Sequence, residues 1–397
     1  MSPRPNRLVP ASLLAAVITA SSFGVAAGTP YRFTALHGPE GAQAIGYGLN
    51  GHSAVAGTSE LHHSGSANAT LWRRDMPLSL NQPGEESIAY GVNRHLAVVG
   101  ISRQIGGNWR ATLWQNGTVT LLPTLGGGYS DAFAINNAGQ IVGDGEVAGY
   151  QHAMRWDGGV PVDLGTLPGG LVSRARAINA LGDVVGHSFT FSNVPHATLW
   201  AADGTVVDLG TLGGVASTAE AVNRHRWAAG SGENADFQTH AALWRDGIVI
   251  DLGTLGEGRT SYGLGIDHEG TVVGFSYTTT DDDVKYRRAA LWRDGAAIDL
   301  NTWLDDATRA AGWVLVASTT VRRPAESRLA AMKCSASKAS LLADWSFSSS
   351  ATRPRKVSEE RISVALKCSC ANVDLPAPEA PTSTTSESCG SVIAVIE

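Results

Sequence analysis

Short runs of apolar and β-branched residues recur between residues 31 and 320, and turn residues separate them. In one stretch, residues 132–135 and 140–143 predict two strands around an Asn-led turn. Residues 152–156 and 160–167 predict two more around Asp157-Gly158. No part of this unit has helical periodicity. Four short strands in about 43 residues is the size of one β-propeller blade.

Six copies of this unit follow one another along the chain. A tryptophan marks each copy, at spacings of 42, 42, 44, 44 and 48 residues: Trp72, Trp114, Trp156, Trp200, Trp244 and Trp292. A turn residue precedes each tryptophan at a similar period: Asn50, Asn93, Asn136, Asn179, Asn223 and Asp267. A shared period predicts a repeat fold, and the hairpin turns favour a propeller over a parallel β-helix, whose coils are shorter. We expect the repeated tryptophan to pack between blades, and a repeated aspartate such as Asp208 to cap a local turn through its carboxylate.

The two ends of the repeat region predict a partial seventh blade. Residues 31–38 match the fourth strand of a copy, and residues 312–316 match a first strand. One N-terminal strand and three C-terminal strands would close the ring and remove free sheet edges. However, the motifs expected after residue 316 are missing. The expected fold is all-β: a propeller of six full four-stranded repeats plus a partial seventh blade over residues 30–320, with a largely disordered C-terminal tail.

Residues 1–27 have the layout of a secretory signal peptide. Arg4 and Arg7 precede an apolar run that starts at Leu8, and small residues end it near Ala27. An uncleaved membrane anchor or a wrong start codon is the alternative. The layout predicts bacterial export to the periplasm, the cell surface or the medium, with no transmembrane segment after removal of the signal.

Composition changes abruptly at residue 321. Of the 46 glycines only Gly390 lies in residues 321–397, whereas all four cysteines do. This tail is predicted to be disordered or the product of a frame change near codon 320, and a genuine appendage is the alternative. In an exported protein the cysteines allow two disulfides, and their pairing stays open. Cys368 and Cys370 are too close together for the usual metal-binding spacing, so no metal site is expected.

Charge and motifs exclude several functions. The net charge of -6 offers no basic face, so no nucleic acid partner is expected. The sequence around Ser53 lacks the second glycine of a nucleophile elbow. The Gly-rich links carry no Gly-Lys-Ser/Thr motif, and no predicted helix follows them. We therefore expect no cofactor and no catalytic residue.

Three repeated phrases resemble a known family. They are DLGTLGG at residues 208–214, AINNAGQIVG at 134–143, and the HA-LW strands that begin at His152, His196 and His240. Over residues 31–320 the chain resembles the HAF-repeat family of extracellular bacterial repeat proteins. The resemblance implies secretion and a repeat fold, and it brings no catalytic residues. Asn68 and Arg110 replace the histidine in the first two copies, and the final unit is missing.

Predicted topology places the loops between second and third strands, together with the links between blades, on one face. These loops carry the residues that differ between copies, so binding is expected there. The candidates are His62, His63, Trp109, Tyr150, Phe237 and Tyr277. One function is a monomeric, non-enzymatic binding or surface scaffold module for a glycan or another cell-envelope component. The alternative is a propeller hydrolase or lyase acting on a polysaccharide or other envelope polymer, which needs symmetry-breaking acids or histidines in the channel. A degraded gene product is a third possibility.

Overall fold

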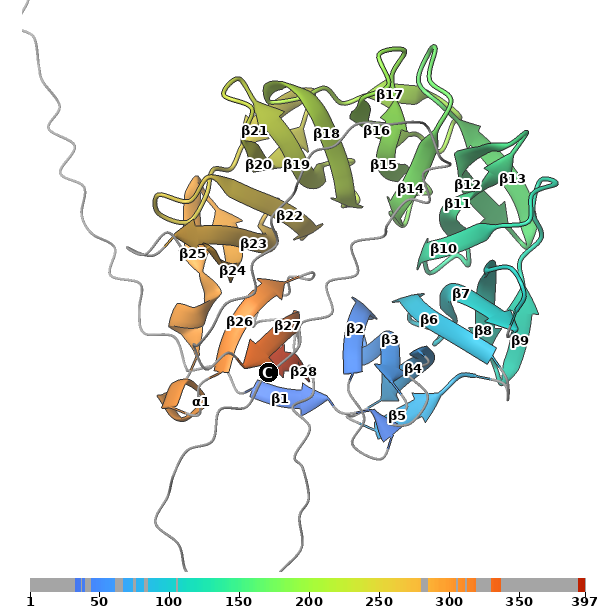
Figure 1. The fold of residues 1–397 in the computed structure, drawn as a ribbon, viewed down its shortest axis with the longest axis horizontal. Coiled ribbons are helices and arrows are strands. Elements are labelled where there is room, and N and C mark those ends of the chain that lie inside the picture. The colour runs from blue at the N-terminus through green and yellow to red at the C-terminus, as the bar shows by residue number, and fades with distance from the viewer. Residues whose placement is uncertain are drawn as a thin grey trace, which may run out of the picture. The chain divides into compact units, whose positions relative to one another are not determined.

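A computed structural model describes residues 33–36, 38–39, 44–60, 67–73, 76–81, 85–104, 106–279, 285–304, 306–310, 313–318, 330–336 and 392–396. The predicted signal peptide, His62, His63 and most of the tail lie outside these residues. Regular structure in the described residues is almost entirely β (Figure 1). The exceptions are a 3-10 turn, η2 (Leu300–Trp303), and the short helix α1 (Asp306–Ala310). No helix in the described part of the chain is long and apolar enough to cross a membrane.

Each of the six repeats forms one four-stranded antiparallel sheet with its strands in chain order, as predicted. We number these sheets blades 1 to 6. Blade 1 consists of β2 (Ala44–Leu49), β3 (Ala54–Glu60), β4 (Ala67–Arg73) and β5 (Met76–Ser79). Blade 2 consists of β6 (Glu85–Val92), β7 (Val98–Gln104), β8 (Arg110–Gln115) and β9 (Thr118–Leu121). Blade 3 consists of β10 (Ser130–Ile135), β11 (Ile141–Val147), β12 (Tyr150–Asp157) and β13 (Val160–Gly165). Blade 4 consists of β14 (Ser173–Ile178), β15 (Val184–Phe189), β16 (Pro195–Trp200) and β17 (Val206–Asp208). Blade 5 consists of β18 (Gly213–Val222), β19 (Ala228–Asn234), β20 (Thr239–Arg245) and β21 (Ile248–Asp251). Blade 6 consists of β22 (Thr260–Ile266), β23 (Val272–Thr279), β24 (Lys285–Arg293) and β25 (Ala296–Asp299).

The predicted seventh blade is a sheet of four strands drawn from distant parts of the chain. Its order is β1 (Phe33–Leu36), β28 (Val392–Ile396), β27 (Ala330–Ala336) and β26 (Trp313–Ser318), and all three pairings are antiparallel. β1 and β26 come from the two segments that the sequence predicts for this blade. The two strands between them come from the tail, although they lack the repeat motifs.

The seven sheets form a propeller, because the first strand of each repeat contacts the first strand of the next (Figure 1). At the closure, β26 contacts β24 of blade 6, and both β27 and β28 contact β2 of blade 1. First strands are therefore innermost and fourth strands outermost. The turns between first and second strands share one face with the turns between third and fourth strands. Loops between second and third strands lie on the opposite face, as predicted.

Apolar side chains pack between neighbouring blades. All six repeat tryptophans are buried, which confirms their predicted role in blade packing. Trp156 packs with Met154 of its own blade and with Ala111 and Leu122 of the preceding one. Its indole N–H donates to the carbonyl oxygen of Pro123 at 2.7 Å. Each tryptophan therefore fills a wedge between two sheets.

The glycine in every second strand allows a close approach to the first strand. A Cβ on Gly143 would lie 1.9 Å from the carbonyl oxygen of Asp131, and one on Gly100 would lie 1.9 Å from that of Ile88. No other residue fits at these distances. The same strands pair with a register shift at this point, so the glycine accommodates a β-bulge in the innermost strand.

Candidate functional site

The repeated asparagine links each blade to the next. Its side-chain Nδ2 donates to the backbone oxygen of the equivalent residue one blade further on, at 2.9, 3.2, 3.1, 3.0 and 2.9 Å for Asn50, Asn93, Asn136, Asn179 and Asn223. Within its own turn, Asn136 Oδ1 accepts hydrogen bonds from the backbone N–H groups of Ala138 and Gln140. The left-handed residue of this turn is Gly139, with φ 84°. The asparagine thus acts through its side chain, and the positive φ of this turn falls on the glycine.

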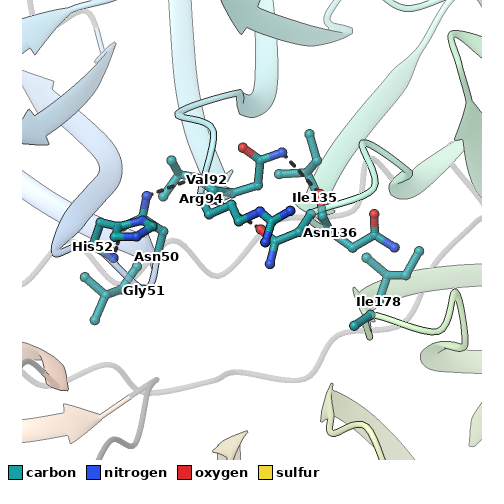
Figure 2. A pocket seen from close by; sticks show the side chains of 12 residues that line it. Asn50, Gly51, His52, Val92, Arg94, Ile135, Asn136 and Ile178 are labelled. Carbon is teal, nitrogen blue, oxygen red and sulfur yellow. Dashed lines mark hydrogen bonds between the residues drawn. The ribbon is translucent and has the colours of Figure 1, made fainter. Parts of the chain in front are cut away.

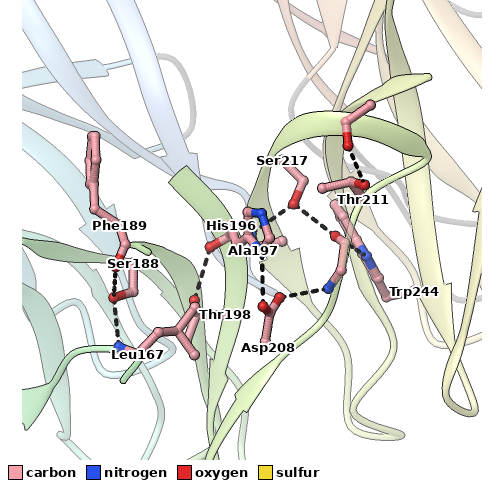
Figure 3. A network of polar contacts seen from close by, with 12 residues as sticks. Leu167, Ser188, Phe189, His196, Ala197, Thr198, Asp208, Thr211, Ser217 and Trp244 are labelled. Carbon is pink, nitrogen blue, oxygen red and sulfur yellow. Dashed lines mark hydrogen bonds and ion pairs between the residues drawn. The ribbon is translucent and has the colours of Figure 1, made fainter. Parts of the chain in front are cut away.

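The histidine and aspartate of the repeated phrases pair with each other (Figure 3). Nδ1 of His196 lies 2.8 Å from Asp208 Oδ2, and the other carboxylate oxygen accepts the N–H of Gly210 at 2.8 Å. The pairs His152–Asp163 and His240–Asp251 repeat this contact at 3.0 and 2.9 Å. The predicted turn-capping role of the aspartate is confirmed. These residues hold a third strand to a fourth strand, so they belong to the scaffold.

A serine that the sequence analysis overlooked completes the scaffold. Ser217 Oγ accepts the N–H of Ala197 in the preceding blade at 2.9 Å and donates to the oxygen of Gly210 at 2.7 Å. Equivalent serines accept an alanine N–H across four further blade junctions: Ser87, Ser130, Ser173 and Ser261. Their spacing of 43 or 44 residues in the sequence could have revealed them.

The predicted loop residues lie on different blades and do not form one site. Tyr150 begins β12 and is 46 % exposed, and Phe237 lies in the loop after β19 and is 72 % exposed. Tyr277 lies within β23, with its ring 5.7 Å from that of Phe275. Trp109 lies in the loop before β8 and lines a hollow. His62 and His63 lie outside the described residues.

The hollow beside Trp109, here called the Trp109 pocket, has a volume of about 330 Å³. Its wall consists of Arg103, Gly107, Asn108, Trp109, Gly128, Tyr129 and Glu146. The guanidinium of Arg103 lies 4.6 Å from the centroid of the Trp109 ring, and Arg103 also pairs with Glu86 at 2.6 Å. These contacts hold the indole in place. The pocket therefore combines aromatic rings with an amide, a guanidinium and a carboxylate.

A second hollow, of about 410 Å³, opens on the opposite face, at the turns of blades 1 to 4 (Figure 2). Its lining includes His52 and Arg94, and apolar residues such as Ile135 and Ile178 that end the innermost strands. The asparagine amides in its wall form the links between blades. Sequence reasoning did not point to this hollow, because it expected binding on the other face.

One bulged residue in the innermost strand of each of blades 1 to 6 forms a row, here called the inner belt: Tyr47, Tyr90, Phe133, Arg176, Glu220 and Leu264. The ring centroids of Tyr47 and Tyr90 are 5.4 Å apart, and those of Tyr90 and Phe133 are 5.2 Å apart. Arg176 lies 4.8 Å over the Phe133 ring, and its Nε is 4.0 Å from Glu220 Oε2. The belt thus changes from aromatic to charged within five blades.

A second set of variable residues consists of cross-strand pairs, in which a residue of the first strand faces a residue of the second strand in blades 1 to 6. These inner pairs are Ile45–Thr58, Ile88–Ile101, Asp131–Asp144, Arg174–His187, Thr218–Ser231 and Tyr262–Phe275. Blade 2 has two isoleucines where blade 3 has two carboxyl groups and blade 4 has an arginine and a histidine. Two acids and a histidine therefore break the symmetry here, and all three side chains are buried.

Burial and neighbouring charges shift the ionisation of this cluster. Burial raises the pKa of Asp131 well above its ordinary value, Asp144 adds to the rise, and Arg176 and Arg174 oppose it. Burial lowers the pKa of His187 to about 3, and the same two arginines add to that effect. Burial also raises the pKa of Glu220 against the pull of Arg176. The cluster can therefore donate and accept hydrogen bonds or protons.

No protein-family model matches this chain, and no curated protein matches it. TolB from Acinetobacter baumannii is 14% identical with a TM-score of 0.41, over 63% of this chain and 62% of TolB. A puromycin-hydrolyzing peptidase from Mycobacterium tuberculosis is 13% identical with a TM-score of 0.45, over 74% of this chain and 49% of the peptidase. A gluconolactonase from Xanthomonas campestris is 13% identical with a TM-score of 0.35, over 78% of this chain and 96% of the gluconolactonase. Similarities this distant carry no argument about activity, and this chain spans less than two thirds of TolB and of the peptidase.

Proposed function

We propose that this chain is an exported, monomeric, non-enzymatic member of the HAF-repeat family that binds a glycan of the cell envelope beside Trp109. The Trp109 pocket carries the proposal, because it is where a loop residue predicted for binding lines a hollow. The layout of residues 1–27 and the repeated phrases support export and the family assignment.

The chemistry of the Trp109 pocket suits a sugar. The C–H face of a sugar ring packs against an indole, and its hydroxyl groups need donors and acceptors held at fixed positions. Asn108 and Glu146 offer both kinds of group beside Trp109. The ion pair between Arg103 and Glu86 orders the indole before a ligand arrives. Such preorganisation lowers the entropic cost of binding.

A glycan array probed with the mature chain tests this function. We expect the chain to bind envelope glycans and Trp109→Ala to weaken binding at least about tenfold, the size expected for the loss of an aromatic anchor. Phe237→Ala is the matched control, since Phe237 is an exposed loop aromatic that lines neither hollow. Absence of any bound glycan, or equal losses in the two variants, would contradict the proposal.

An enzymatic function is the second candidate, and the Asp131–Asp144 pair favours it. Two neighbouring carboxyl groups, one of which has a raised pKa, are the parts of a general acid and base. A hydrolase or lyase acting on an envelope polysaccharide would use them in this way. Mass spectrometry of any bound glycan after incubation separates the two functions. Shorter products made by the wild-type chain but not by Asp144→Asn would identify an enzyme, and an intact glycan would exclude one.

A further inference from the structure

The charged inner pairs are not needed to build a blade. Blade 2 has Ile88 and Ile101 at the positions where blade 3 has Asp131 and Asp144. Burying titratable groups costs free energy that buried isoleucines do not cost. The acidic pair and the buried His187 of blade 4 therefore call for an explanation other than folding.

Tyr129 connects this cluster to the Trp109 pocket. It lines the pocket, and its hydroxyl donates to Asp131 Oδ2 at 2.8 Å. From there polar contacts continue to blade 4, because Gln151 Nε2 donates to Asp144 and Arg174 donates to Gln151 Oε1 at 2.5 Å. A chain of polar contacts thus runs from the pocket, through the buried side chains of Asp131 and Asp144, to Arg174 in blade 4.

The inner belt next to these residues is accessible to solvent. The side chains of Arg176 and Glu220 are 28% and 31% exposed to solvent. Arg176 also lies 4.8 Å over the Phe133 ring, and the ring centroids of Phe133 and Tyr90 are 5.2 Å apart. A partly exposed ion pair next to aromatic rings suits a ligand with both hydroxyl groups and apolar faces.

We infer that the glycan site continues from the Trp109 pocket past Tyr129 onto the inner belt, so that the ligand is an oligosaccharide and not one terminal sugar. Further sugar rings pack on Tyr90 and Phe133, and their hydroxyl groups bind Arg176 and Glu220. This inference rests on the proposed function, because it extends the same site.

Titration calorimetry with sugars of increasing length tests the inference. The probes are the monomer to the hexamer of β-1,4-linked N-acetylglucosamine, α-1,4-linked glucose and α-1,4-linked galacturonic acid. In at least one series we expect the tetramer to bind at least about tenfold tighter than the monomer. This gain corresponds to about 1.4 kcal/mol from added contacts. Phe133→Leu and Glu220→Gln should remove the gain and leave the affinity for the monomer unchanged.

Leucine suits this test because Leu264 occupies the equivalent position in blade 6, so the variant should fold. Arg155→Gln is the control, since Arg155 lies on the third strand of blade 3 and pairs with Asp157. Binding that does not depend on length, or equal losses for monomer and tetramer in Phe133→Leu, would overturn the inference and leave the pocket intact. Absence of binding in all three series would overturn both proposals for these sugars.

Discussion

Blades 2 and 3 have the same strands, the same buried tryptophan and the same asparagine link, yet they differ where their inner strands pair. Blade 2 places Ile88 opposite Ile101 there, and blade 3 places Asp131 opposite Asp144. The comparison separates two kinds of position. Repeated positions hold blades together, and variable inner positions carry chemistry that the fold does not require. Substitutions at the two kinds of position should therefore behave differently, above all in their dependence on pH.

The largest effect is expected at His187, on acidification. The unfolded chain takes up a proton at His187 below the ordinary pKa of 6.5, whereas the folded chain does so only near a pKa of about 3. The stability that this residue contributes is therefore complete above pH 6.5 and is lost as the pH falls towards 3. We expect a loss on the order of 4 kcal/mol for the wild type.

Urea unfolding across this pH range measures the loss. His187→Ile, which places the isoleucine of blade 2 in blade 4, should lose less stability over the same interval. Equal pH profiles for the two proteins would show that His187 is not the residue responsible.

At the repeated position Asn136, a smaller effect that depends little on pH is expected. Asn136→Ala removes the hydrogen bond to the Asn179 oxygen and the side-chain contacts within its own turn. The expected cost is about 1–3 kcal/mol of unfolding free energy. Asn136→Asp should cost less, because it keeps the acceptor oxygen, as Asp267 does in blade 6. Thermal unfolding at neutral pH ranks the variants, and an Asn136→Asp variant as stable as the wild type would argue against a role for the link between blades.

The smallest effect is expected at Asp131, and it should be a gain. Because folding raises its pKa above 3.8, the stability it contributes is complete below that pH and is lost as the pH rises through the folded value. Asp131→Asn stays neutral and keeps an oxygen for the Tyr129 hydroxyl. The variant should therefore be more stable than the wild type at neutral pH, with little difference near pH 3. Unfolding at the two pH values is the measurement, and a less stable variant at pH 7 would contradict the assignment.

Much of the fold follows from local patterns. The strand pairs on either side of the Asn-led turns, the buried tryptophans and the turn-capping aspartates agree with the sequence. Segments 31–38 and 312–316 join one sheet as expected. The serine links were not predicted, although their spacing is regular. The asparagine links were not predicted either, because the partner of each asparagine lies about 43 residues away, in the next blade.

The candidate site was only partly predictable. Trp109 could be named because it is an aromatic residue in a variable loop, and it does line a hollow. The inner belt could not be named, because Tyr90, Phe133 and Arg176 stand among residues that look like ordinary strand alternation. Their common feature is a bulge in the innermost strand, which is a property of strand pairing.

By itself, the sequence determined the repeat, the number of full blades and the identity of the scaffold residues. Each blade must meet the same requirements, so those residues recur at one period. The tertiary structure alone decided which unlike residues meet. Asp131 lies beside Asp144 because their two strands pair antiparallel in blade 3. Arg174 approaches this pair because blade 4 packs against blade 3. A functional cluster built from residues that differ between repeats has no periodic pattern in the sequence. Its members come together only when the ring of sheets forms.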